Sequence, residues 1–365
     1  MIVSRYFATN KTRYKKSKGI HAGLALMGIL ESLSPATLDL LSQSATALGS
    51  MRDAQGALDA QGIYVSLTRI STAVRVTAAA ARSLRKDYAS LKRLEIQGTK
   101  IVVSVDGGRI RIRRDKKGSK TKRNRRRYTT DWREPKLLCI YFLSENGEID
   151  RSIASILDGT MAQVDEIFKM LCNYLSMLPI NSETEVLFIS DGADCLWRRV
   201  YLVEQVVRNK GGRFYCLLDY YHMKGYLHTM ADSAKDWSQK KRRQWIGQMT
   251  KFLFSGNNAS FESEVKSLQK NSRRKSTLRT AGNYLLKHSL SGHMNYEQIK
   301  FRKFPIGSGV IESTVRRVVN LRLKGASVYW TESMAEDMLL LRCFYKAMRW
   351  KHIEKQEFIP LNLAA

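Results

Sequence analysis

Acidic residues and cysteines are scarce in this 365-residue sequence. The chain holds 33 Asp and Glu against 62 Lys and Arg, so its formal net charge is +29. Its five cysteines are odd in number and include no pair at Cys-x-x-Cys spacing. A zinc site or a disulfide framework is therefore not expected, and this cysteine usage is typical of a reducing cytoplasm.

Long apolar runs are also lacking. The N-terminus has no apolar core of signal-peptide length, and no stretch is long and apolar enough to span a bilayer. We expect no membrane partner, because no basic amphipathic anchor occurs together with a lipidation motif. Hydrophobic residues still make up 44% of the chain, which excludes a disordered basic tail. The excess positive charge favours nucleic acid as a partner, since bound Lys and Arg release counterions from phosphates.

The first part of the chain is predicted to be helical. Residues 1–20 form a polar, basic arm, and helical patterns follow over residues 21–95, with Ser34 as an N-cap before Pro35. A turn at Gly62 between two helical stretches is compatible with a DNA-reading helix-turn-helix. An ordinary helical hairpin fits the same pattern, because no base-reading code is visible.

From residue 101 the pattern changes to short apolar strands and helices. Three strands in meander order are followed by helix, strand, helix, strand, which predicts a mixed five-stranded α/β sheet with helices on its faces. That order of elements is the RNase H-like arrangement. The predicted strands are 101–106, 136–144, 149–157, 185–191 and 212–219, and the predicted helices are 165–178 and 196–209.

This pattern divides the chain into a sheet domain and its additions. The RNase H-like domain takes in residues 96–222 and 301–350. A basic, helix-prone insertion after the fifth strand, residues 223–300, separates the two parts of that domain. The helical N-terminal domain precedes them, and residues 351–365 form a tail.

Two aspartates occupy the same position at the ends of predicted strands. Asp106 in VVSVDGG and Asp191 in LFISDGA each end a buried strand and precede glycine. Sites form at such strand ends in open α/β sheets, and glycine lets a ligand approach the backbone closely. Taken singly, each Asp-Gly pair is also common turn or capping chemistry.

A third carboxylate follows a distinctive turn in FPIGSGVIEST. The turn, residues 305–309, delivers Glu312 to the start of an apolar helical stretch. Ile311 and Val315 are expected to bury that helix and to hold Glu312 at the edge of its buried face. The alternative for Glu312 is a helical ion pair with Arg316, worth roughly 0.2–0.5 kcal/mol.

Asp106, Asp191 and Glu312 would repel one another if the fold brings them together. Two such charges about 4 Å apart cost on the order of 4 kcal/mol at an effective dielectric constant near 20. Divalent cations remove this cost, and Mg²⁺ prefers carboxylates, water and substrate phosphate as ligands. Two ions roughly 3.5–4 Å apart can hold the attacking and leaving oxygens of an in-line phosphodiester displacement. We therefore expect a site for two Mg²⁺ ions, with Mn²⁺ as a substitute.

Four stretches together resemble a bacterial insertion-sequence DDE transposase of the Mutator-like type. They are VVSVDGGRI, FISDGADCLW, LLDYYH, and PIGSGVIESTVRRVVNLRLKGASVYW with LLLRC after it. The resemblance covers roughly residues 100–350, and the last stretch is its most specific part. It implies the three carboxylates above as the catalytic, metal-binding triad.

The same resemblance implies a catalytic D-x-x-H pair, Asp219 and His222, at the end of the fifth strand. Both side chains can face the site, where His222 would contact a phosphate or position a water rather than bind metal. A structural hydrogen bond between Asp219 and His222 at a helix start is the alternative. Relatives often carry an acidic residue three positions after this His, where this chain has Gly225.

The resemblance implies a transposase that acts in the cytoplasm, at the nucleoid, on the ends of its own element. Water and then a 3′-hydroxyl would attack phosphodiesters in terminal inverted repeats and target DNA, and dimers or larger assemblies would bring two ends together. Three alternatives remain: a structure-specific RNase H-like nuclease, a DNA-binding protein that has lost catalysis, and a ribosome-associated basic protein. The three carboxylates argue against the last two.

A basic stretch, residues 109–128, directly follows the first of these strands. It is predicted either as a solvated, disordered hairpin tip or as a phosphate clamp beside the metal site. Both predictions hold if the stretch is disordered in the free protein and becomes ordered on DNA. If about eight phosphates are neutralised, log affinity falls with log salt at a slope near −7. Trp197 and Trp330 are expected in the core rather than stacked on bases. The predicted DNA contacts are Arg109, Arg111, Arg113, Lys116, Lys117, Arg125, Arg126, Arg127, Arg322 and Lys324.

Overall fold

A computed structural model gives the arrangement of most of the chain. The residues it describes are 29, 33–85, 100–122, 126–270, 276–325 and 328–357, with the backbone alone for 354–357. The predicted basic arm, Arg125 and the end of the predicted tail lie outside the described residues.

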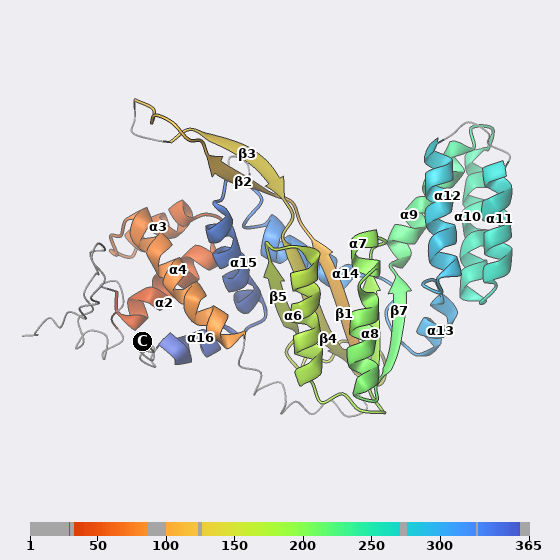
Figure 1. The fold of residues 1–365 in the computed structure, drawn as a ribbon, viewed down its shortest axis with the longest axis horizontal. Coiled ribbons are helices and arrows are strands. Elements are labelled where there is room, and N and C mark those ends of the chain that lie inside the picture. The colour runs from red at the N-terminus through yellow and green to blue at the C-terminus, as the bar shows by residue number, and fades with distance from the viewer. Residues whose placement is uncertain are drawn as a thin grey trace, which may run out of the picture.

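A mixed sheet of five strands forms the centre of the fold (Figure 1). Its order is β5-β4-β1-β6-β7, in which β4 runs antiparallel to β1 and β5, while β1, β6 and β7 are parallel. The predicted mixed five-stranded α/β sheet is thus confirmed. The strands are β1 (Lys100–Gly107), β4 (Lys136–Leu143), β5 (Ile156–Thr160), β6 (Glu185–Ser190) and β7 (Arg213–Leu218).

The third strand in sequence, β5, begins seven residues later than predicted. Residues 149–155 form a bend rather than regular strand. The carboxylate of Asp150 accepts hydrogen bonds from the backbone N–H and the hydroxyl of Ser152, at 2.8 and 2.6 Å. This Asx-type turn competes with strand pairing, which explains why the apolar pattern was misleading there.

Helices cover both faces of the sheet. Helices α6 (Val164–Met177) and α8 (Val200–Asn209) pack on one face, against the β1 side chains Ile101, Val103 and Val105. Behind the other face lie three further helical segments, which share a core with the alternate β1 residue Val102. They are α14 (Gly309–Val315), the π-helix η1 (Arg316–Asn320) and α15 (Glu332–Lys346). Burial on both faces accounts for the near-continuous apolar strands in the sequence.

The helices of the N-terminal part belong to that second core. They are α2 (Pro35–Ala47), α3 (Met51–Asp59) and α4 (Leu67–Leu84), and they pack beside α15 and α16 (Trp350–Glu357) in Figure 1. The Ser34 hydroxyl caps α2 by accepting from the Thr37 N–H, and Gly62 turns the chain with a φ of 77°. Both local predictions are confirmed. The helix-turn-helix reading of α3 and α4 stays a prediction.

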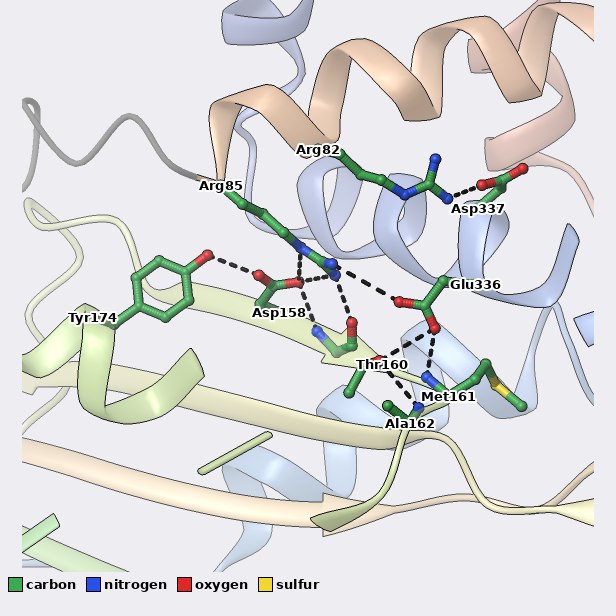
Figure 2. Close-up of polar contacts among 10 residues, drawn as sticks. Arg82, Arg85, Asp158, Thr160, Met161, Ala162, Tyr174, Glu336 and Asp337 are labelled. Carbon is green, nitrogen blue, oxygen red and sulfur yellow. Dashed lines mark hydrogen bonds and ion pairs between the residues drawn. The ribbon is translucent and has the colours of Figure 1, made fainter. Parts of the chain in front are cut away.

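Ion pairs join α4 to the sheet and to α15 (Figure 2). Arg85 donates from Nη2 to Asp158 of β5 at 2.6 Å, and the Tyr174 hydroxyl of α6 donates to the other Asp158 oxygen at 2.8 Å. Arg82 pairs with Asp337 of α15. Because Asp158 is fully buried and accepts from Arg85 and Tyr174, the N-terminal helices are fixed to the part of the fold that contains the sheet.

Between β7 and α14 the chain is helical. Figure 1 shows α10, α11 and α12 side by side at one end of the molecule, with α9 leading into them from β7. No helix of the described residues is long and apolar enough to cross a membrane. The helices of this segment are α9 (Tyr220–Ser233), α10 (Gln239–Phe254), α11 (Asn258–Lys270), α12 (Ser276–Leu290) and α13 (Tyr296–Phe301).

The basic stretch after β1 is largely a β-ribbon. Strands β2 (Ile110–Asp115) and β3 (Tyr128–Arg133) pair antiparallel and project from the body of the fold (Figure 1). A wholly disordered hairpin tip, one of the two expectations for this stretch, is therefore wrong for residues 110–115 and 128–133. Their alternating polar and β-branched or aromatic side chains are compatible with strand pairing.

Candidate functional site

Three aspartates stand in a row at the carboxyl ends of β1, β6 and β7. In the register of β1 and β6, Val103 pairs with Phe188, so that Asp106 and Asp191 follow at the same level. In the register of β6 and β7, Ser190 pairs with Leu218, so that Asp219 is next in the row. Neighbouring strands lie about 4.8 Å apart. The sheet therefore brings together two predicted triad residues and the first residue of the predicted D-x-x-H pair.

Side chain and backbone bonds fix this row. The Ser190 hydroxyl donates to the Val105 carbonyl of β1 at 2.9 Å, and the Asp219 N–H donates to the Ser190 carbonyl at 2.9 Å. Ser190 is almost completely buried, so these bonds are protected from water. The strand ends are thereby held in register immediately before each aspartate.

Asp219 is a fully buried carboxylate at the start of α9. Its Oδ1 accepts from the His222 N–H at 2.7 Å and lies 3.0 Å from the His222 ring Nδ1. Its Oδ2 accepts from the Ser308 N–H at 2.5 Å. Burial raises the pKa of Asp219, but the bonds from His222 and Ser308 outweigh it and leave the pKa below its ordinary value.

His222 is half exposed and faces the same site. Its hydrogen bond to Asp219 raises the pKa of the imidazole, against the opposing effect of partial burial. The structural Asp–His bond that was the alternative for this pair is therefore present. It orients the ring without removing it from the surface, and the site role expected for His222 stays a prediction.

Glu312 reaches the site through the turn at residues 305–309. The Ser308 hydroxyl donates to Oε1 of Glu312 at 3.2 Å, while the Ser308 backbone holds Asp219. Among the described residues Glu312 makes no ion pair with Arg316. As predicted, Ile311 and Val315 are buried beneath an exposed Glu312. The turn thus serves to place this carboxylate.

Asp219, His222 and Glu312 form one cluster, with one potential ligand atom from each within 4.8 Å of the others. Three donors already occupy the oxygens of the buried Asp219. Glu312 and His222 are the exposed members of the cluster. The resemblance implied that all three residues belong to one site, but it assigned the metal to Asp106, Asp191 and Glu312 and expected no metal contact from His222.

The pKa of Asp106 depends on the other acidic groups of the site. Burial is the largest cause of a raised pKa at Asp106, and together with the charges of Asp191 and Glu312 it brings the pKa to about 6, against the opposing effects of the Gly107 N–H and His222. The bond from the Gly107 N–H to Asp106 is 2.7 Å long. A divalent cation would offset this repulsion, and carboxylate oxygens are the donors that Mg²⁺ prefers. Among the described residues, however, only Asp219, His222 and Glu312 each place a ligand atom within 4.8 Å of one another, so the structure does not bring Asp106, Asp191 and Glu312 together as one metal cluster.

Glycines beside the acidic residues make room for the protein's own side chains. A Cβ at Gly192 would lie 1.8 Å from the Tyr284 hydroxyl, and one at Gly307 would lie 2.7 Å from the Tyr221 ring. The expectation that a ligand approaches the backbone at the Asp191-Gly192 step is therefore wrong. Tyr284 of α12 fills that space, and no sequence signal pointed to it.

Tyr284 connects the helices after β7 with the acidic row. Its ring stacks on Tyr226 of α9, with centroids 3.7 Å apart and an angle of 17° between the planes. Tyr226 in turn lines an open cavity of about 500 Å³. The cavity is lined by Tyr221, His222, Gly225, Tyr226, Thr229 and Glu312.

Gly225 leaves part of this cavity open, because nothing lies within 4 Å of its Cβ position. The cavity therefore has room beside Gly225.

Most of the described basic residues predicted to contact DNA are on the surface. Arg111 is partly buried and donates to the Gly325 carbonyl at 3.0 Å. The side chains exposed are those of Arg109, Arg113, Lys116, Lys117, Arg126, Arg127 and Lys324.

Arg322 does not belong to that surface. Its side chain is only 3% exposed, its Nε donates to the Ala45 carbonyl at the end of α2, and its guanidinium lies 5.1 Å from the Trp330 ring. Burial lowers its pKa to about 10, with a further contribution from Arg342. The prediction of a DNA contact is corrected to a structural role, which closes the C-terminus of α2.

The two tryptophans pack as expected. Trp330 is 6% exposed and donates to the Leu323 carbonyl at 2.9 Å, and Trp197 donates to the Asp191 carbonyl at 2.7 Å. Trp197 ends the short helix α7 (Asp194–Trp197) and so fixes the backbone of a triad candidate.

Comparison with known proteins adds no assignment: no family model matches the chain, and no curated protein or solved structure is significantly similar to it.

Proposed function

We propose that the protein is a DDE transposase with an RNase H-like catalytic domain. The observation that carries the proposal is the row formed by Asp106 and Asp191 on adjacent parallel strands, with Glu312 held beside it. The strand order β5-β4-β1-β6-β7, with one antiparallel strand, agrees with the order expected for that fold. The net charge of +29 agrees with a polyanionic substrate.

Each residue then has a defined task. Asp106, Asp191 and Glu312 would hold two Mg²⁺ ions, or Mn²⁺, which supply positive charge for in-line attack on a phosphodiester. Asp219 orients His222 and raises its pKa, which favours the protonated ring that can donate to a phosphate oxygen. Ser308 keeps Glu312 in place through both its hydroxyl and its backbone.

The partners proposed are double-stranded DNA at the terminal inverted repeats, target DNA, and a second copy of the chain. Pairing two element ends requires at least a dimer, and the N-terminal helices would help to recognise the repeats. Action at the bacterial nucleoid, in the cytoplasm, follows from this function. These points rest on the sequence resemblance.

Strand cleavage on DNA that flanks the coding sequence tests the proposal. Wild-type protein with Mg²⁺ or Mn²⁺ should nick at the element ends and then join the 3′ end to a second duplex. Glu312→Gln should abolish both steps but keep DNA binding, whereas the exposed control Glu148→Gln should retain both. Cleavage that persists in Glu312→Gln would overturn the assignment. Cleavage of branched DNA without joining would favour a structure-specific nuclease.

A further inference from the structure

The β2–β3 ribbon has the composition of a nucleic-acid contact and the exposure of a free surface. Strand β3 is exposed from Tyr128 to Trp132, with these two aromatic side chains 45% and 51% accessible. The neighbouring positions of β2 and of the connection are basic and exposed. They are Arg113, Arg114, Lys116, Lys117, Lys120, Lys122, Arg126 and Arg127.

The root of the ribbon is fixed to the body of the protein. Ile110 and Ile112 are at most 1% exposed. The Arg113 N–H donates to the Trp330 carbonyl at 2.8 Å, and the Trp330 N–H donates to the Arg111 carbonyl at 3.1 Å. Trp330 therefore pairs with β2 on the side away from β3, so the ribbon leaves the body in a defined direction.

The two faces of the ribbon differ. The face with Ile110 and Ile112 is buried at the root, so the opposite face points to solvent. On that open face Arg113 stands opposite Thr130. Closer to the root, the Arg111 guanidinium is held 5.5 Å from the Trp132 ring and 5.0 Å from the Tyr329 ring.

We propose that the β2–β3 ribbon enters the major groove of duplex DNA with this open face toward the bases. The major groove admits a two-stranded ribbon, and an arginine can bind guanine O6 and N7 with two hydrogen bonds. Arg113 and Thr130 are the base-reading pair. The basic residues at the tip, Lys116, Lys117, Arg126 and Arg127, hold the phosphates on either side. This inference rests on the proposed function only in taking DNA as the partner.

The length of the ribbon also limits the distance between the bases that it contacts and the phosphodiester that is cleaved. Its first strand begins at Ile110, shortly after Asp106, and the ten residues from Asp106 to Lys116 span at most about 33 Å when extended. Duplex DNA advances about 3.4 Å per base pair. The bases that the ribbon reads therefore lie within about ten base pairs of the phosphodiester at the acidic site.

Salt-dependent binding to a duplex of random sequence tests the phosphate contacts. The full-length double variant Lys116→Ala/Lys117→Ala should reduce the slope of log affinity against log salt by about 1.8, since each lost phosphate contact removes about 0.9. The control Lys240→Ala/Arg243→Ala removes the same charge from exposed positions of α10 and should change the slope less. Equal changes in the two variants would overturn the placement of DNA on the ribbon.

Methylation interference on a duplex selected for tight binding tests the groove. Methylation of guanine N7, in the major groove, should block binding by the wild type within about ten base pairs of the cleaved bond. Arg113→Ala should lose this interference while remaining folded. Interference restricted to adenine N3, in the minor groove, or tighter binding of single-stranded DNA or RNA would overturn the proposal.

Asp106→Ala separates this inference from the proposed function. Retained interference in that variant supports the ribbon proposal independently of catalysis. Wild-type interference at guanine N7 without any metal-dependent cleavage would support the ribbon and contradict the transposase.

Discussion

The backbone N–H of Ser308 donates a 2.5 Å hydrogen bond to the buried carboxylate of Asp219, 89 residues earlier in the chain. Asp219 begins α9, which carries His222, and Ser308 begins α14, which carries Glu312. One carboxylate therefore sets the position of two exposed site residues. The helices between them can extend away from the sheet without displacing either residue.

Replacing Asp219 with Asn should weaken the fold and free the histidine. The amide offers only one acceptor oxygen for donors that now bind both oxygens, so a buried N–H loses its partner. We expect a loss of about 2–4 kcal/mol in the free energy of unfolding. The pKa of His222 should fall, because its anionic partner is gone. Urea unfolding and an NMR titration of the His222 ring measure the two effects.

An exposed aspartate on the same helix provides the control. Asp232 pairs with Arg242 at 3.1 Å near the surface, and Asp232→Asn should cost less than about 1 kcal/mol. Equal stability of the two variants would contradict the role assigned to Asp219.

Asp106→Asn should stabilise the metal-free protein near neutral pH. The pKa of Asp106 rises from 3.8 to about 6 on folding, so the folded state holds the proton more tightly than the unfolded state. The free energy of unfolding of the wild type should therefore fall as pH rises from 3.8 to about 6, and the variant should lack this fall. The gain near pH 7 should be about 1–3 kcal/mol.

Unfolding in chelator at several pH values measures this gain. Asp150→Asn is a suitable control, because the Ser152 hydroxyl and N–H lower the pKa of this exposed carboxylate. That variant should show no gain at neutral pH. An Asp106→Asn protein that is less stable than wild type at neutral pH would show that burial and the neighbouring charges do not make the ionised carboxylate of Asp106 unfavourable in the folded state.

Local signals predicted the sheet and its acidic row well. The strand ends at Asp106, Asp191 and Asp219 could be foreseen because each follows a short apolar run, and at Asp106 and Asp191 a glycine comes directly after the aspartate. The Ser34 cap is local in the same way. The one misplaced strand, β5, failed where the side chain of Asp150 bonded the backbone instead of a neighbouring strand.

Contacts between distant segments could not be foreseen. Arg322 lies in a basic stretch that reads as a DNA contact, and only the packing of α2 against it reveals a buried role. The hydroxyl of Tyr284 meets Gly192 from a polar helix with no marked pattern. In both cases the deciding partner is far away in sequence, so composition and periodicity carry no information about it.

Gly192 and Tyr284 should be strongly coupled. A methyl group at Gly192 would overlap the Tyr284 ring and hydroxyl, so Gly192→Ala should destabilise the protein by about 1–3 kcal/mol. In a Tyr284→Ala background the same substitution should cost less than about 0.5 kcal/mol, because the space is then free. Thermal or urea unfolding of the four proteins gives the coupling energy. Additive effects would contradict the contact.

Substitutions at Arg322 and at Lys324 should have different effects, the first on the free energy of unfolding and the second on DNA binding. Arg322 is buried against α2 and Trp330, so Arg322→Ala should lower the free energy of unfolding by about 1–3 kcal/mol through lost packing and a lost hydrogen bond. Its salt slope for DNA binding should match that of the wild type. Lys324 is exposed, so Lys324→Ala should leave stability nearly unchanged and reduce the slope by about 0.9 if Lys324 contacts a phosphate. A reduced slope for folded Arg322→Ala would return that arginine to the DNA-binding surface and refute its structural role.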